Sequence, residues 1–185
     1  MIQEEDIEAP VSLSLTPYSG TWTKVQAAHL LRRTLFGPTF AQIQQAVADG
    51  MNATVAQLLT LPAVTEPLAV DPAETIATFG TSWVNSVYPS SNQPAVNNAR
   101  EYSLGGWMME RLNQPTVSIQ EKMCLFWTNH FGATASFDAR GVYNMHQLYR
   151  ANCLGNFKQL VKDITIDPNM LFFLNGVSNN QFAPN

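Results

Sequence analysis

The sequence predicts an all-α fold, an irregular multi-helix array with short connections and one longer polar loop. Apolar residues recur at the three- and four-residue spacing of a helix face in several segments. Sequences typical of helix starts occur at Thr39, Asp71, Ser118 and Asp167. No segment shows the apolar–polar alternation that is typical of a half-buried strand. We therefore expect helices that pack their apolar stripes against one another.

Residues 1–21 are rich in Pro, Ser and Glu and are expected to form an extended lead-in. A single helical domain is expected to follow over residues 22–185, beginning with a compact subunit at residues 22–60. Gln42, three residues after Thr39, completes a capping box in this subunit. The expected helices of the subunit are 23–35, 40–49 and 52–60.

Residues 61–71 contain two prolines and are predicted to be a linker to the main helical part, residues 72–185. This part opens with a sequence typical of a helix start, an Asp cap followed by Pro and then by Glu74 at the third helical position. Residues 88–98 are rich in Ser, Asn and Pro and form the predicted polar loop. Further helices are expected from 95 or 99 to 112, and at 118–131, 143–154, 156–164 and 169–174.

Gly105 and Gly106 lie inside the expected helix that ends at residue 112. Each costs about 1 kcal/mol relative to Ala in a helix interior. This cost predicts that a neighbouring helix approaches closely at the two glycines. Residues 138–142 are predicted to be a loop.

The composition excludes two classes of partner. Only 13% of the residues are charged, and the formal net charge is −4. Apart from Arg32 and Arg33 the basic residues are scattered, so we expect no nucleic-acid partner. No stretch approaches the roughly 20 apolar residues of a membrane span. The start of the chain lacks an apolar run of signal-peptide length, which leaves a cytoplasmic protein or an exported one whose targeting segment is not in this chain.

The two cysteines, Cys124 and Cys153, both fall in predicted helices. They are interpreted as buried free thiols, with one disulfide as the alternative. Their spacing is not that of a metal site.

His130 is the residue that the sequence favours for chemistry. A helical projection from Ile119 places His130 in the middle of an apolar stripe, at the C-terminal end of its helix. Burial favours the neutral imidazole and the helix end favours the cation. His130 is therefore a candidate acid, base or metal ligand, and its neighbour Asn129 is a second catalytic candidate. The alternative is a core histidine that is hydrogen-bonded to a neighbour.

His146 could approach His130 in space, and these two histidines are the candidate metal ligands. No H-x-x-x-H spacing supports this pair, and the sequence does not identify a cofactor. His29 precedes two arginines and is interpreted as a surface or structural residue.

Other catalytic signatures are absent from the sequence. There is no G-x-S-x-G elbow, no Gly-rich phosphate loop and no pair of carboxylates suited to acid–base work. Glu121 is interpreted as a helix-capping residue. The aromatic residues in the middle of the chain are interpreted as core, except Trp83 and Tyr88 near the polar loop, which are predicted to be exposed and could line a sugar or peptide groove.

Four runs of the chain stand out together: residues 27–39, residues 121–131, residues 154–157 continuing to Asp167-Pro168 and Met170-Leu171, and a final Pro184-Asn185. These runs resemble signatures of the bacterial domain-of-unknown-function 1800 (DUF1800) family. The ordered set extends over most of residues 22–185. The resemblance implies a helical bacterial protein that is often exported, to the periplasm or outside the cell, and whose chemistry is not established.

The chain departs from the family pattern in two ways. Thr128 stands where members often carry a second histidine, which weakens a two-histidine site. The family pattern also continues past Pro184-Asn185 into a helix rich in Glu and Arg. We therefore expect the domain to be truncated at its C-terminus, with an edge that a further segment or another chain would complete.

Two functions follow as hypotheses. The first is a non-enzymatic binding or assembly module of an exported bacterial protein, with a protein or a glycan as its partner. The alternative is the N-terminal part of a metal- or histidine-dependent hydrolase, whose remaining site residues lie beyond this chain. A third hypothesis is a structural scaffold piece completed by another chain.

Overall fold

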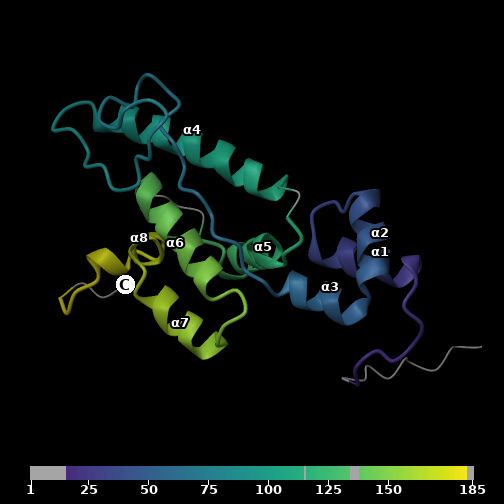
Figure 1. The fold of residues 1–185 in the computed structure, drawn as a ribbon. Coiled ribbons are helices and arrows are strands. Elements are labelled where there is room, and N and C mark those ends of the chain that lie inside the picture. Colours follow the sequence, from purple (N-terminus) through teal and green to yellow (C-terminus); the bar gives the residue numbers. More distant parts are fainter. Residues whose placement is uncertain (1–15, 115, 134–137, 183–185) are drawn as a thin grey trace, which may run out of the picture.

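The computed structural model describes residues 16–114, 116–133 and 138–182, and there it confirms the all-α fold (Figure 1). The helices are α1 (Lys24–Thr34), α2 (Phe40–Asp49), α3 (Met51–Leu58), α4 (Gln93–Leu112), α5 (Gln120–Phe131), α6 (Ala139–Ala151), α7 (Phe157–Thr165), α8 (Pro168–Phe173) and the short 3-10 helix η1 (Gly176–Ser178). The described residues form no sheet and contain an isolated antiparallel bridge between Leu68 and Ser82. The lead-in up to residue 15 and Pro184-Asn185 lie outside the described residues.

Helices α1, α2 and α3 form one group beside the rest of the molecule (Figure 1). The capping box at the start of α2 is confirmed, because Thr39 accepts a hydrogen bond from the backbone of Gln42 and the Gln42 side chain accepts one from the backbone of Thr39. The group has its own apolar core, made by Ala27, Leu31, Leu35, Ile43, Ala46 and Leu58.

The helix predicted to start at Asp71 is absent, and residues 71–92 are irregular. Asp71 accepts a hydrogen bond from the backbone N–H of Ala73 at 2.8 Å, but only a turn follows. Glu74 does not serve a helix N-terminus. Its Oε1 accepts hydrogen bonds from the N–H groups of Ile76 and Ala77, and its other oxygen faces Arg100 of α4.

Glu74 and Arg100 form a buried ion pair that fastens this irregular segment to α4. The Arg100 Nε lies 2.5 Å from the Glu74 carboxylate, and both side chains are almost completely buried. Arg100 also donates to the carbonyl oxygens of Ser86 and Val87, at 3.0 and 3.1 Å. The Tyr88 ring lies 4.4 Å from its guanidinium carbon. One side chain of α4 therefore holds both ends of the segment 74–88.

Trp83 was predicted to be exposed, and this prediction is wrong, because the residue is 0% exposed. Its indole N–H donates to Ser103 Oγ at 2.9 Å, and Ser103 donates in turn to the carbonyl of Leu68 at 2.5 Å. Tyr88 is half-buried and donates to the side-chain oxygen of Asn97 at 2.7 Å. Both aromatic residues fold back onto α4 because the helix offers them hydrogen-bond partners.

The segment predicted to be a linker, residues 61–71, packs against α4. The carbonyl of Thr65 accepts a hydrogen bond from the indole N–H of Trp107 at 2.7 Å, and Ala69 is buried. Ala69 belongs to the same apolar core as Trp83, Trp107 and Tyr143. The division of the chain into a subunit, a linker and a main part stays a prediction.

Three further helix starts differ from expectation. Helix α4 begins at Gln93, inside residues 88–98 that were predicted to be the polar loop, so the loop is shorter than predicted. Helix α6 begins at Ala139, where a loop was predicted, because Asp138 accepts hydrogen bonds from the first N–H groups of the helix. Helix α5 lacks the predicted capping box. Ser118 accepts only a 3.3 Å bond from the Gln120 backbone, and the Glu121 side chain pairs with Arg150. The predicted Asp167 cap of α8 is confirmed.

Both cysteines are buried and free, as favoured from the sequence. Burial raises the pKa of Cys124 to about 12, so this thiol stays protonated and unreactive at neutral pH. Among the described residues, no helix combines the length and the apolar character that crossing a membrane requires.

The close helix approach predicted at Gly105 and Gly106 is wrong. Both glycines are exposed, and a Cβ atom at either one would meet nothing within 4 Å. The two glycines therefore lower the stability of α4 without a packing reason in the described part of the chain.

We expect Gly105→Ala and Gly106→Ala each to raise the free energy of unfolding by about 0.5–1 kcal/mol, because each restricts the unfolded chain and fits the helix without a clash. Urea denaturation measures this change. Gly132→Ala is the control, since Gly132 has a φ of +63° and the substitution is expected to destabilise. A loss of stability in both α4 variants would contradict the exposed position of these glycines.

We expect Glu74→Ala to lower the free energy of unfolding by about 3–5 kcal/mol, because it leaves the Arg100 charge buried and unpaired. Glu110→Ala is the matched control. It removes the partner of Arg111 on the same helix, but Glu110 is mostly exposed, and we expect a loss below about 1 kcal/mol. Equal losses in the two variants would show that the buried pair does not fasten the segment 74–88.

Candidate functional site

His130 lies on the last turn of α5, and it is exposed instead of lying in a buried stripe. The buried residues of α5 are Gln120 and Cys124. The side of α5 that faces the core is therefore rotated away from the apolar stripe that was predicted around His130. The apolar spacing was correct for a helix, but it did not show which side the neighbouring helices would cover.

His130 is surrounded by aromatic rings. Its ring centroid lies 5.1 Å from that of Phe131, 5.7 Å from Trp127 and 6.0 Å from Phe126, on which it stacks. Phe157 of α7 stacks on Trp127 at 5.5 Å. Phe126 is 53% exposed and Phe157 is 52% exposed. We call these five residues, which span α5 and α7, the aromatic face.

The other predicted site residues lie around or beneath the aromatic face. Asn129 is exposed on α5, next to His130. His146, on α6, lies edge-on to the Tyr149 ring at 5.9 Å. Burial, with a smaller contribution from Arg150, lowers the pKa of His146 to about 4. His146 is therefore a neutral imidazole at neutral pH.

The described ring contacts do not join the two histidines directly. His130 contacts Phe131, which stacks on Tyr149 at 5.9 Å, and Tyr149 contacts His146. Among the described residues, no three or more His, Cys, Asp or Glu side chains gather in a group that could hold a metal. The roles of Asn129, His130 and His146 stay predictions.

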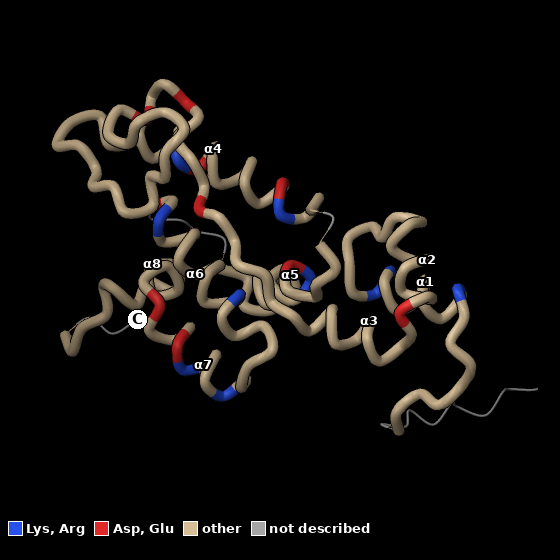
Figure 2. The backbone as a smooth tube through the Cα atoms, viewed as in Figure 1, with Lys and Arg blue, Asp and Glu red and all other residues tan. Residues whose placement is uncertain are grey.

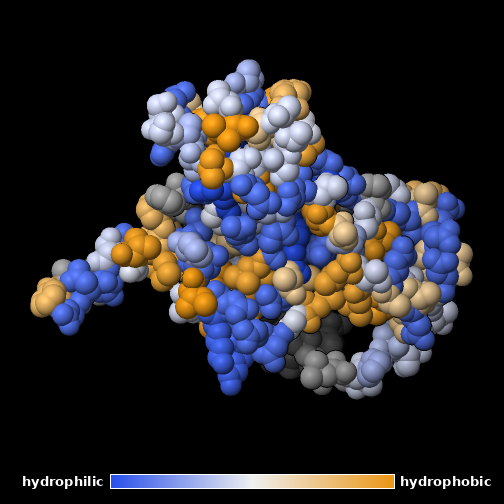
Figure 3. Space-filling view, turned by 60° about the vertical axis from the view of Figure 1, so that its left-hand side comes forward, coloured by the Kyte–Doolittle hydropathy of each residue, from blue (hydrophilic) through white to orange (hydrophobic). Residues whose placement is uncertain are grey.

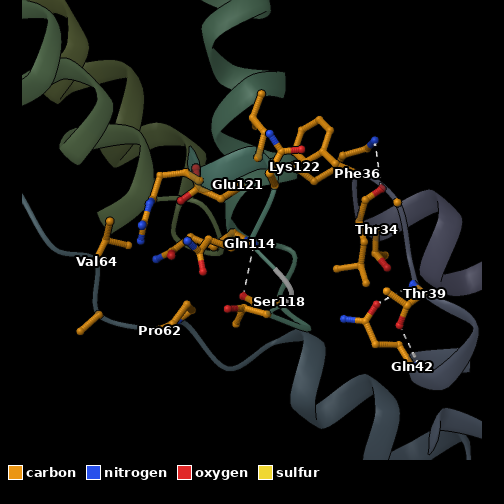
Figure 4. A pocket seen from close by; sticks show the side chains of 18 residues that line it. Thr34, Phe36, Thr39, Gln42, Pro62, Val64, Gln114, Ser118, Glu121 and Lys122 are labelled. Atoms are coloured by element: carbon orange, nitrogen blue, oxygen red, sulfur yellow. Dashed lines mark hydrogen bonds between the residues drawn. The ribbon is translucent and has the colours of Figure 1, made fainter. Parts of the chain in front are cut away.

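A polar cavity of about 240 Å³ lies between the α1–α2 turn, the segment 62–64, the end of α4 and the start of α5 (Figure 4). One side of the cavity forms where the end of α3 contacts the start of α5. The backbone N–H of Ile119 donates to the carbonyl of Leu58 at 2.9 Å, and Ser118 donates to the carbonyl of Thr60 at 2.9 Å. Most polar lining residues carry amides or hydroxyls, namely Thr34, Thr39, Gln42, Asn113, Gln114, Thr116, Ser118 and Gln120.

The charged residues that line the polar cavity have partners. Arg150 binds the Glu121 carboxylate through two hydrogen bonds, at 2.7 and 3.1 Å, and both side chains are largely buried. Lys122 lies 4.4 Å from the centre of the Phe36 ring and donates to a backbone carbonyl at 3.4 Å. Arg111 pairs with Glu110 at 2.7 Å. Few other charges lie nearby, because charged residues are sparse along the chain (Figure 2).

Two polar atoms of the cavity lining are buried without a hydrogen-bond partner. They are Oε1 of Gln120, a residue that is 5% exposed, and Nε of Arg111. Buried polar groups in native proteins are normally paired, so each of these atoms needs an explanation. Sequence reasoning missed both residues. A polar side chain such as Gln120 is ordinary in the first turn of a helix, and a basic one such as Arg111 is ordinary in the last turn.

Two other cavities lie elsewhere. One is an apolar groove of about 700 Å³ beside α1 and α3, where Trp22 and His29 contribute to the lining. The other, of about 400 Å³, lies at the starts of α6 and α8, where Asp138 pairs with Arg140. The walls of the polar cavity come from three parts of the sequence, residues 34–42, residues 62–64, and the end of α4 with the start of α5.

Comparison with known proteins gives one match. A family model described as protein of unknown function (DUF1800) matches residues 29–185, which contain the aromatic face and all but the first part of the helical domain. No curated protein and no solved structure matches the chain.

We expect the pH dependence of stability to report the burial of His146. Its pKa is lowered from 6.5 to about 4 in the folded protein, so the unfolded chain binds the proton more tightly. The contribution of neutral His146 to the free energy of unfolding is complete above about pH 6.5 and decreases as the pH falls toward 4. The free energy of unfolding is expected to fall by about 2 kcal/mol between about pH 7 and pH 5 for this reason.

Urea unfolding at several pH values in this range measures the decrease in the free energy of unfolding. We expect the His146→Phe variant to lack the part of this decrease that comes from protonation of His146. His29→Phe is the control, because His29 is exposed on α1. An unchanged pH dependence in His146→Phe would contradict the lowered pKa.

Proposed function

This chain belongs to the DUF1800 family, and we propose that it is a non-enzymatic binding or assembly module of an exported bacterial protein that docks a protein partner on its aromatic face. The observation that supports this proposal most directly is the exposure of Phe126 and Phe157, each more than half accessible on neighbouring helices. Large aromatic side chains are enriched in protein–protein interfaces, where a few of them supply most of the binding energy.

The aromatic face has the features of a preorganised surface. Trp127 and Phe131 pack against the core of α5–α8 and support Phe126, Phe157 and His130 from beneath. Side chains that are already ordered lose less conformational entropy when a partner binds. Hydrophobic residues also interrupt the hydrophilic surface elsewhere, as Figure 3 shows for one side of the molecule. Isolated exposed apolar residues are ordinary, whereas a stacked group of rings is more typical of a contact surface.

Polar groups next to the aromatic face indicate the character of the partner. Lys158 follows Phe157 in the sequence and is exposed on α7, and Asn129 is exposed next to His130 on α5. We expect the partner to present apolar side chains flanked by acidic or amide groups.

The hydrolase alternative depends on a group that could activate His130. A general acid or base must lie within about 2.6–3.2 Å of the polar group with which it exchanges a proton. The described contacts of His130 are instead with aromatic rings. The Glu121 carboxylate, on the same helix, is bound by Arg150. The described residues therefore favour binding over hydrolysis.

Site-specific photo-crosslinking tests the proposal. A photoreactive phenylalanine analogue at position 126 is expected to trap one protein partner in an extract of the source cells. The same analogue at position 102, where Tyr102 is exposed on α4, is expected not to trap it. The partner, once identified and purified, is expected to bind the Phe126→Ser, Phe157→Ser double variant at least about tenfold more weakly, the loss of one interface anchor or more.

Thermal melting establishes that the double variant is folded. Identical crosslinked products at positions 126 and 102, or unchanged affinity of the double variant, would contradict docking on the aromatic face. Turnover of an ester, glycoside or peptide substrate that disappears in His130→Ala would contradict a non-enzymatic role and favour the hydrolase.

A further inference from the structure

We propose that the apolar groove beside α1 and α3 binds an acidic, amphipathic segment of a partner protein. The groove lies on other helices than the aromatic face, and this inference does not depend on that face. It rests on exposed apolar side chains that line the groove and on two arginines that continue the same side of α1.

The lining of the groove is apolar and largely preformed. Trp22 is held in place because its indole N–H donates to the carbonyl of Ala46 at 3.0 Å. Val25 of α1 is 72% exposed and Val55 of α3 is 38% exposed, and both line the groove. Large apolar side chains that stand exposed around a hollow of about 700 Å³ are typical of a surface that another molecule covers.

Helical spacing places two arginines beside the groove. His29 and Leu30 of α1 line the groove, and Arg33 follows them by four and three residues, so it lies on the same side of the helix. Arg32 follows His29 by three residues and lies at the edge of this side. Both arginines are exposed, and neither pairs with a carboxylate of the described residues. Lys24, by contrast, is turned toward α2, where its Nζ lies 4.1 Å from the centre of an aromatic ring.

The charges of this region favour an acidic partner. Between residues 16 and 60 the sequence has three basic residues, all on α1, and one acidic residue, whereas the whole chain has a formal net charge of −4 (Figure 2). The acidic residue, Asp49, accepts a hydrogen bond from Gln45 of α2 and does not belong to the groove lining. A segment with Asp or Glu side chains therefore meets two arginines without an ion-pair partner and no carboxylate in the lining.

The position of the arginines selects a peptide segment over other acidic molecules. An occupant that covers Val25 and also reaches Arg33 extends over about 12 Å along α1. A compact apolar molecule with one acidic group would fill the groove without reaching the arginines. An anionic membrane is recognised by clusters of about four to eight basic residues, more than α1 carries. One turn or more of an amphipathic helix, with apolar side chains on one face and acidic ones beside it, matches the groove and the arginines together.

Fluorescence anisotropy with the full chain and labelled synthetic peptides tests the proposal. The peptides LEELFDEILEE, LQQLFNQILQQ and LKKLFKKILKK share their apolar residues and are acidic, neutral and basic. We expect the acidic peptide to bind with a dissociation constant of about 10–100 μM at about 50 mM salt, and at least about tenfold more weakly at about 500 mM salt, because exposed charges are screened. The neutral peptide is expected to bind at least about tenfold more weakly than the acidic one, and the basic peptide not to bind.

A first pair of variants tests the charges. Arg32→Gln with Arg33→Gln removes the two cations, and Lys158→Gln with Lys162→Gln makes the same change on the exposed side of α7. We expect the arginine variant to bind the acidic peptide at least about tenfold more weakly and the lysine variant to bind it unchanged.

A second pair of variants tests the apolar lining. Val25→Ser with Val55→Ser is expected to weaken binding of the acidic peptide at least about tenfold, because it removes apolar surface that the peptide would cover. Val87→Ser with Val177→Ser is the control, since both residues are exposed elsewhere on the molecule. All four valines are at the surface, so the variants are expected to fold, and thermal melting measures this.

Equal affinity for the acidic and neutral peptides would overturn the proposal, as would unchanged binding in the arginine variant or in the variant of Val25 and Val55. The absence of saturable binding of all three peptides would also overturn it. Vesicles of phosphatidylcholine and phosphatidylglycerol are the last probe, and the chain is expected not to bind them. Vesicle binding that the acidic peptide does not displace would overturn the proposal and make this side of α1 a lipid contact.

Discussion

The buried pair of Glu74 and Arg100 is the interaction that fixes the long irregular segment 74–88 on α4. Removing two charges from water is costly, and a buried pair forms only where further hydrogen bonds complete it. Arg100 donates to the Ser86 and Val87 carbonyls, and Glu74 accepts from two backbone N–H groups. Burial alone would raise the pKa of Glu74, but the hydrogen bonds from Arg100 and from the backbone lower it below its ordinary value. The long irregular segment thus keeps one position on α4 without regular secondary structure.

The same kind of interaction explains why two predicted helix starts differ from the structure and a third does not. Glu74 and Glu121 both stand at the position of a capping box, and each instead pairs with an arginine from a helix much later in the chain. Gln42, at the same position after Thr39, keeps its capping role. A carboxylate gains more from a buried arginine than from a single backbone N–H, whereas a neutral amide has no such alternative. In this chain the capping box therefore forms where the third residue is Gln42, and it does not form where that residue is Glu74 or Glu121.

The sequence predicted most of the helices, because apolar spacing along a helix is a local property. It did not predict which side of a helix would be covered. Phe126 and His130 share a face with apolar residues, but the buried residues of α5 are Gln120 and Cys124, a choice made by packing against α6 and its neighbours. The sequence also did not predict the polar cavity, and the reason is related. Its walls come from three distant parts of the sequence, and Gln120 is unusual only because of what surrounds it in space.

The pair of Glu121 and Arg150 joins the start of α5 to α6. Glu121 lines the polar cavity, and its carboxylate is bound there by Arg150. Arg150 belongs to α6 and lies 4.7 Å from the Trp107 ring of α4. Its neighbour in sequence, Tyr149, stacks beneath Phe131 of the aromatic face. The pair therefore joins α5 to α6 at the wall of the polar cavity, and the helix that supplies Arg150 also supplies the Tyr149 ring that stacks on Phe131.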